Sequence, residues 1–186
     1  MSIFSIHTAQ TAPEAARPIL DGAKRKYGFV PNLLGALAEA PAALQAYATL
    51  ADILAKSSFT PTEREVVLIT VSTLNECHYC VAAHSTIAGM HNVPAEVIAA
   101  LRDGRPIADA RLEALRRFTK TLVEKRGWAT EDDVQALLAA GFSRGQALEV
   151  VLGVAFKTLS NYANHLIGTP LDDAFAPQEW TAAKAG

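Results

Sequence analysis

Half of the residues are hydrophobic, and they fall into segments separated by proline, glycine and polar capping residues. A proline or a Ser/Thr cap precedes most segments, and glycine or asparagine follows several of them. These are the start and stop signals typical of helices. We therefore predict nine helices and an irregular tail beyond Pro170. The helices are expected at residues 13–26, 31–40, 41–56, 60–74, 77–92, 94–102, 108–126, 130–141 and 143–166.

Two of these helix starts carry a capping box, in which a Ser/Thr side chain and a Glu/Gln three residues later bind each other's backbone N–H. Thr60 with Glu63 forms one box, and Ser143 with Gln146 forms the other. The β-branched run at 66–71 has the composition of a buried strand, but the box ahead of it and the length of the segment favour a helix. The sequence predicts an all-α fold.

Composition excludes several classes of protein. The chain has 186 residues without a linker or low-complexity segment, so we expect one domain over residues 1–186. Its apolar content is too high for a disordered chain. A net charge of −2 means that the chain lacks the excess of positive charge that binds nucleic acid. No apolar stretch reaches the roughly 20 residues that span a bilayer, and residues 1–10 lack the regions of a signal peptide. We expect a cytoplasmic protein that binds neither membranes nor nucleic acid.

The two cysteines are too few for a disulfide scaffold, and in the cytoplasm they would be reduced at rest. Cys77 and Cys80 form a C-x-x-C pair, and His84 follows four residues later. On a helix that advances about 100° per residue, Cys80 lies near −60° and His84 near −20° relative to Cys77. The three side chains therefore share one face, with the imidazole one turn beyond Cys80.

This spacing suits thiol chemistry. The partial positive charge at a helix N-terminus favours a thiolate, and a nearby imidazole accepts the thiol proton. Two thiols at this separation also close into a disulfide when oxidised. Two other interpretations stay open: small buried residues beside a packed histidine, or a zinc site with Cys77, Cys80 and His84 as ligands. A second C-x-x-C or a histidine pair that would complete a structural zinc site is missing from the sequence.

Glu65 is the candidate partner for this group. Leu68, Ile69 and Ser72 follow it at helical spacing, so a carboxylate on that mostly apolar face would have a raised pKa and suit a proton relay. The alternative is an ordinary acid in the first turn of a helix, where the helix dipole favours it. Glu63 is explained by the capping box.

A polar cluster, Asn161, Tyr162, Asn164 and His165, lies near the end of the ninth predicted helix. These side chains either line a pocket or subunit contact, or make capping and interhelix hydrogen bonds.

Several of these motifs together resemble a known family. The sequence is similar to the AhpD-type alkylhydroperoxidase branch of the carboxymuconolactone decarboxylase superfamily. The resemblance is carried by Glu65, by CHYC twelve residues later at 77–80 and VAAH at 81–84, and by the flanking segments 28–32, 60–65 and 167–172.

The resemblance covers about residues 25–175 and implies an AhpD-like helical bundle. It also implies a homo-oligomer of trimers or their multiples, and thiol-dependent reduction of hydrogen peroxide or organic hydroperoxides. A dithiol or lipoyl-type partner would be the reductant. We expect no cofactor, because no glycine-rich phosphate loop occurs in a strand–turn–helix context.

By position, the resemblance makes Cys77 and Cys80 the redox pair, His84 the base and Glu65 the relay carboxylate. We favour Cys77 as the attacking thiol because it is nearer the helix end, with Cys80, next to His84, as the alternative. Tyr79 stands where the AhpD prototype has histidine. A phenol with a pKa near 10 is a poor base but a competent hydrogen-bond donor, so we expect an altered rate or substrate range.

Two other functions fit the same family. One is a decarboxylase or lactone-acting enzyme, whose branch does not need the C-x-x-C pair. The other is a non-catalytic redox sensor, which turnover with peroxide and reductant would distinguish from an enzyme.

Overall fold

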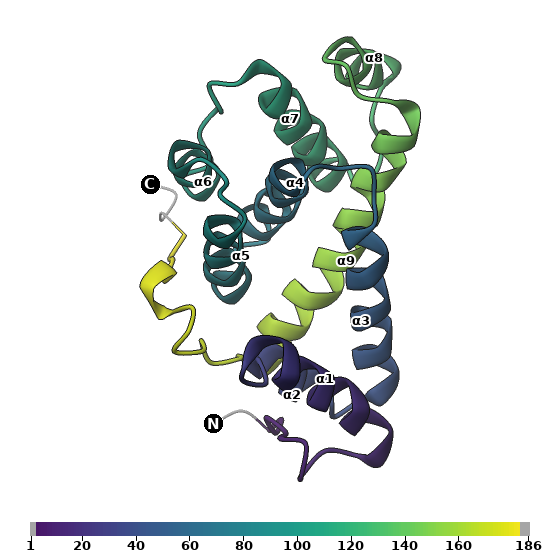
Figure 1. Cartoon of the computed structure of the whole chain (residues 1–186). Helices are drawn as coiled ribbons and strands as arrows, with labels where there is room; N and C mark the ends of the chain where they lie inside the picture. Colours follow the sequence, from purple (N-terminus) through teal and green to yellow (C-terminus); the bar gives the residue numbers. More distant parts are fainter. Residues whose placement is uncertain (1–2, 183–186) are drawn as a thin grey trace.

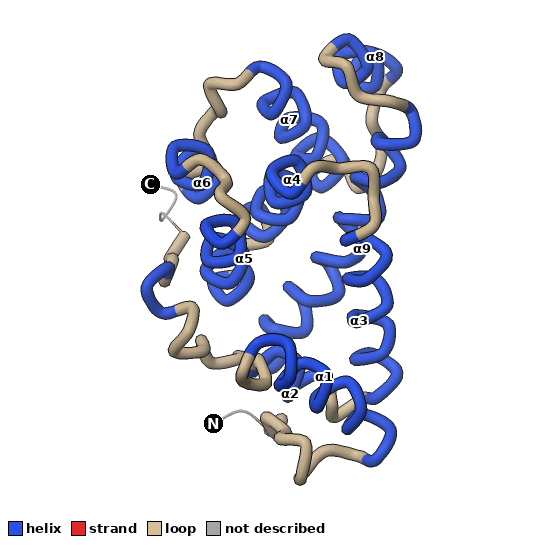
Figure 2. The backbone as a smooth tube through the Cα atoms, viewed as in Figure 1, coloured by secondary structure: helices blue, strands red, loops and turns tan. Residues whose placement is uncertain are grey.

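Short connections link the α-helices of the described part of the chain, residues 3–182 of a computed structural model (Figures 1 and 2). This part contains nine α-helices and two 3-10 helices but no strand, which confirms the all-α prediction. The elements are η1 (Glu14–Ala16), α1 (Arg17–Tyr27), α2 (Asn32–Leu37), α3 (Pro41–Ala55), α4 (Pro61–Leu74), α5 (His78–Met90), α6 (Ala95–Arg102), α7 (Ala110–Glu124), α8 (Glu131–Ala139), α9 (Arg144–Ile167) and η2 (Ala176–Gln178).

The capping boxes form as the sequence predicts. The Thr60 side chain accepts a hydrogen bond from the Glu63 N–H, and the Glu63 carboxylate accepts one from the Thr60 N–H. Ser143 and Gln146 make the same reciprocal pair at the start of α9. The β-branched run at 66–71 lies wholly within α4, so the capping box and segment length indicated its structure correctly.

Helix α9 runs through the molecule beside α3 and α4 (Figure 1). Gly153 allows the close approach of α9 to α4, because a Cβ at this position would come within 2.7 Å of a Val67 methyl carbon. Helix α4 also packs against α5 and α7, so it is central to the fold. The largest hydrophobic cluster joins α4 to α6, α7, α8 and α9, whereas a second cluster joins η1, α1, α2 and α3 to the start of α5.

The segment after α9 returns to the start of α5. The chain turns at Gly168, which has a left-handed backbone conformation with φ of 67°. It then runs past α5 toward α6, the yellow trace in Figure 1, and η2 packs against α5. The tail therefore covers the helix that carries the C-x-x-C pair.

Within residues 3–182, no single helix has both the length and the apolar character needed to cross a membrane. Only α8 and α9 taken together satisfy both criteria, and the chain bends by 111° between them.

Candidate active site

The turn between α4 and α5 places Cys77 at a helix start. Helix α4 ends in a Schellman motif, in which the Cys77 N–H donates to Ser72 O and the Glu76 N–H donates to Thr73 O. Glu76 takes the left-handed conformation that this motif requires, with φ of 53°. Cys77 is then the N-cap residue of α5, and its carbonyl accepts the first helical hydrogen bond, from Val81.

The helical hairpin of α4 and α5 brings the side chains of Glu65 and His84 into contact. Glu65 lies nine residues before the end of α4 and His84 lies six residues after the start of α5, so both are within about 14 Å of the turn along their helices. Oε2 of Glu65 is 2.9 Å from Nδ1 of His84, and both side chains are buried. An ionised carboxylate only accepts hydrogen bonds, so Nδ1 carries the proton and Nε2 is left to accept another.

The two sulfur atoms face α9. The side-chain amide of Asn164 donates to Cys80 Sγ at 3.2 Å and to Cys77 Sγ at 3.7 Å. Ser160 Oγ lies 3.8 Å from Cys80 Sγ. Both cysteines are free thiols, and their exposed fractions are 0% and 1%. The pair is thus enclosed between α5 and the polar residues of α9.

The two thiols differ in acidity. The pKa of Cys77 is raised, first by its hydrogen bonding to Cys80 and then by burial. Burial also acts to raise the pKa of Cys80, but hydrogen bonding to the Cys77 thiol and the charges of Lys157 and His84 outweigh it. The net result is a Cys80 pKa well below the usual value, so Cys80 is the sulfur that ionises first.

Tyr79 lies in the same turn of α5, but its hydroxyl binds other partners. It donates a hydrogen bond to Asp172 Oδ2 at 2.5 Å and accepts one from the Leu33 N–H at 3.3 Å. Burial and the hydrogen bond to Asp172 both raise the pKa of Tyr79, which keeps the phenol protonated. Phe175 packs edge-on against its ring. Tyr79 thus joins α5 to α2 and to the tail.

We expect Tyr79→Phe to loosen the tail. The change removes the hydroxyl from two buried hydrogen bonds, which corresponds to about 1–3 kcal/mol of unfolding free energy. Amide hydrogen exchange over residues 169–180 should accelerate, and the thermal midpoint should fall by several degrees. Tyr27→Phe is the matched control, because Tyr27 is 49% exposed, and it should change neither. Unchanged exchange in Tyr79→Phe would rule out this anchoring role.

The structure thus brings Glu65, Cys77, Cys80 and His84 together and directs the hydroxyl of Tyr79 to the tail. Three residues that sequence reasoning did not assign to the site complete it: Lys157, Ser160 and Asp172. A signal existed, since Lys157 interrupts an apolar stretch of α9 and Ser160 follows at helical spacing. In the polar cluster of α9, Asn161 accepts an interhelix hydrogen bond from Asn75, whereas Tyr162 and His165 are exposed.

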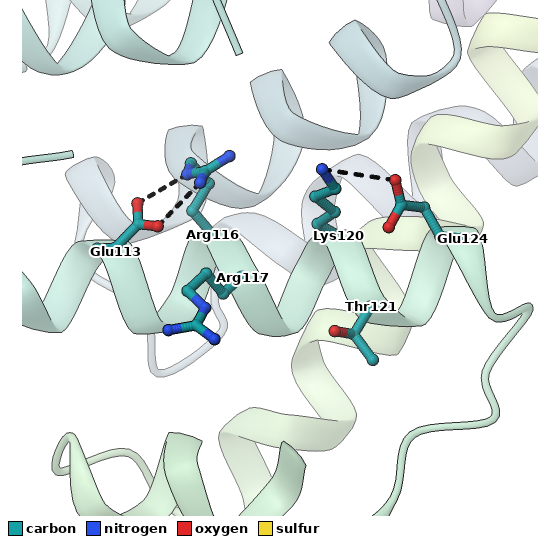
Figure 3. Close-up of a pocket in the computed structure, with 6 residues that line it drawn as sticks. All are labelled: Glu113, Arg116, Arg117, Lys120, Thr121 and Glu124. Atoms are coloured by element: carbon teal, nitrogen blue, oxygen red, sulfur yellow. Dashed lines mark hydrogen bonds and ion pairs between the residues drawn. The ribbon is translucent and has the colours of Figure 1, made fainter. Parts of the chain in front are cut away.

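No group of three or more Cys, His, Asp or Glu side chains in residues 3–182 is placed to hold a metal ion. A surface hollow elsewhere, lined by α7 residues, is charged (Figure 3). In it Arg116 binds Glu113 at 2.7 Å, and Lys120 lies 3.6 Å from Glu124. Its lining contains no cysteine or histidine, so it is separate from the thiol pair.

Comparisons with known proteins identify the family and the fold. Residues 28–121 match the model of the carboxymuconolactone decarboxylase family, whereas no curated protein matches the sequence. A crystal structure from Ralstonia eutropha JMP134, described as an alkylhydroperoxidase AhpD core and an uncharacterized peroxidase-related protein, is 27% identical over 94% of both chains, with a TM-score of 0.84.

Two more distant structures share the fold. An uncharacterized peroxidase-related protein from Silicibacter sp. TM1040 is 21% identical, covering 94% of this chain and 93% of its own, with a TM-score of 0.80. A variant of the debrominase Bmp8 in complex with 2,3,4-tribromopyrrole is 20% identical, covering 96% and 97%, with a TM-score of 0.74.

Proposed function

Since the chain belongs to the carboxymuconolactone decarboxylase family and carries an enclosed C-x-x-C pair, we propose that it is a thiol-dependent peroxidase. The family includes both AhpD peroxidases and decarboxylases. The observation that carries the proposal is the placement of the two thiols against α9, where the Asn164 amide donates to Cys80 Sγ at 3.2 Å and to Cys77 Sγ at 3.7 Å, and Ser160 Oγ lies 3.8 Å from Cys80 Sγ. Cys80, with a lowered pKa, suits the attacking thiolate, and Cys77, with a raised pKa, suits the resolving thiol. This reverses the expectation from the helix end alone, which favoured Cys77.

The cycle we propose needs only the residues of this site and two substrates. The Cys80 proton passes to Nε2 of His84, whose Nδ1–H is held by Glu65. The Cys80 thiolate attacks the distal oxygen of a hydroperoxide, the O–O bond breaks, and the leaving alkoxide takes the proton from His84. Sulfur is thereby oxidised to a sulfenic acid and the peroxide is reduced to an alcohol, or to water if the substrate is hydrogen peroxide.

In the second half of the cycle, the Cys77 thiol attacks the sulfenic acid. A disulfide forms, and the Cys77 proton leaves with the hydroxyl group as water. An external dithiol then reduces the disulfide by exchange and is itself oxidised. The near-complete burial of both sulfurs favours hydrogen peroxide or a small hydroperoxide, because a bulky one would have to displace the side chains of α5 and α9 that enclose them.

Mass spectrometry with thiol counting tests this proposal. One equivalent of peroxide should remove both free thiols and two hydrogens from the reduced chain, and a dithiol such as reduced lipoamide should restore them. Catalytic consumption of peroxide should require both the chain and the dithiol. A pair that stays reduced, or that oxidises without any turnover, would contradict the proposal, and the second result would favour a redox sensor.

A decarboxylase or lactone-acting enzyme is the second candidate from the family, but no residue of the site specifically favours it. We propose in addition that the protein is cytoplasmic, uses a dithiol or lipoyl-type reductant, and forms a homo-oligomer. A stripe of exposed apolar side chains on α9 supports the oligomer, which sedimentation equilibrium would reveal. The stripe consists of Leu148, Val151, Tyr162 and Leu166.

A further inference from the structure

Lys157 lies in the interior of the protein, halfway along α9. Its side chain is 0% exposed, and its Nζ has no hydrogen-bond partner in the described part of the chain. The closest aromatic ring, that of Phe156, is centred 5.5 Å from Nζ. An ammonium group removed from water is strongly unfavourable unless a charge or several acceptors compensate for it. In the described part of the chain, no hydrogen bond of ordinary length and angle compensates for this buried amine.

The helical position of Lys157 points to the compensating group. Lys157, Ser160 and Asn164 lie at positions i, i+3 and i+7, which share one face of a helix. Ser160 and Asn164 both reach the sulfur of Cys80 from that face. The same face also carries two buried polar atoms without a hydrogen-bond partner in the described part of the chain, Nδ2 of Asn161 and Oδ1 of Asn164. Lys157 thus belongs to a buried polar face directed at the thiol pair.

The ionisable groups around the pair come from three other elements. They are Tyr47 on α3, Glu65 on α4, and Cys77 and His84 on α5. Burial first, and then the charge of Cys80, raise the pKa of Tyr47, so it stays neutral. The carboxylate of Glu65 is already bound to His84. The raised pKa of Cys77 leaves that thiol neutral, so Cys80 is the remaining group of this set that can supply a negative charge to Lys157.

We propose that Lys157 is the buried counter-ion of the Cys80 thiolate, a positioning residue that holds this sulfur in its nucleophilic form. The inference rests on the proposed function in taking Cys80 as the reactive sulfur. It accounts for two observations together, an ammonium without a hydrogen-bond partner and a buried thiol that ionises readily. Lys157 also makes the site electropositive, which favours the anionic alkoxide that leaves during peroxide reduction.

The test uses the full chain with Cys77→Ser, so that Cys80 is the only thiol, and measures the rate of its alkylation by iodoacetamide against pH. Lys157→Met keeps the length of the side chain and removes its charge. The alkylation midpoint should move up by at least one pH unit, which lowers the rate by about tenfold or more at pH values below the original midpoint. The thermal midpoint should fall at pH values where Cys80 is ionised, because one partner of a buried ion pair has been removed.

Lys56→Met is the matched control, since Lys56 is exposed, and it should leave the alkylation midpoint in place. If Lys157→Met does not fold, Lys157→Gln removes the charge while keeping a polar head group, and the same upward shift is expected. An unchanged midpoint in the folded variant would overturn the proposal and leave Lys157 a packing residue. Alkylation needs no peroxide, so a shifted midpoint in a chain that fails to consume peroxide would reject the peroxidase and retain the counter-ion.

Discussion

Cys80→Ser is expected to reduce dithiol-dependent peroxide consumption by about 10³-fold or more, because a serine hydroxyl stays protonated where a buried thiol ionises. The polar groups around Cys80 make it the more acidic sulfur, and His84, which binds Glu65 of α4, lies one turn away on the same helix as Cys80. Stopped-flow measurement of peroxide loss with excess dithiol gives the rate. In the unmodified chain the rate should also fall as the pH drops through the pKa of Cys80, which lies well below the usual thiol value, because the thiolate becomes protonated.

Cys77→Ser is the matched variant, since it removes the neighbouring sulfur from the same turn of the same helix. It should block the catalytic cycle but still allow one rapid reaction with peroxide, because Cys80 forms its sulfenic acid before Cys77 takes part. Trapping with dimedone should therefore label Cys77→Ser and leave Cys80→Ser unlabelled. The opposite labelling pattern would make Cys77 the attacking thiol, as the helix-end argument from the sequence predicts.

The α4–α5 half of the site could be predicted from the sequence because it depends on local rules. The Thr60–Glu63 capping box determines where α4 begins, and the spacing from Glu65 to His84 then places both in one hairpin. The acidity of Cys80 could not be read in this way. It depends on Lys157, which is 77 residues away along the chain. Lys157 comes near the thiol pair because α9 packs against α4 and α5.

The partners of Tyr79 likewise could not be predicted from the local sequence. Its position beside Cys80 predicted a hydrogen-bond donor, and its hydroxyl does donate, but to Asp172 in the tail. The irregular sequence beyond Pro170 gives no indication that this segment folds back onto α5. Local patterns therefore predicted which residues lie near the thiols, whereas tertiary packing determines which of them interact with sulfur and which hold the surrounding segments together.

Glu65→Gln is expected to lower the rate of peroxide consumption by about 10²-fold, the lower end of what general acid–base groups contribute. Glutamine keeps the shape of the side chain and an oxygen that accepts from Nδ1 of His84, but it lacks the charge that makes the imidazole a better base. The measurement is the second-order rate constant with peroxide, with the thermal midpoint recorded for the same sample. A small effect on the midpoint is expected, since the geometry of the hydrogen bond is retained.

Glu63→Gln separates this effect from the general loss of a buried carboxylate. Glu63 lies two residues earlier in α4 and is about as buried, but it binds Arg111 at 2.9 Å and caps the helix at Thr60. Its replacement should cost about 1 kcal/mol of unfolding free energy, from the weakened ion pair and cap, and leave the rate constant nearly unchanged. Equal losses of activity in the two variants would mean that Glu65 acts through stability. A loss confined to Glu65→Gln is what a proton relay through His84 requires, because Glu65 is the carboxylate whose oxygen lies 2.9 Å from Nδ1.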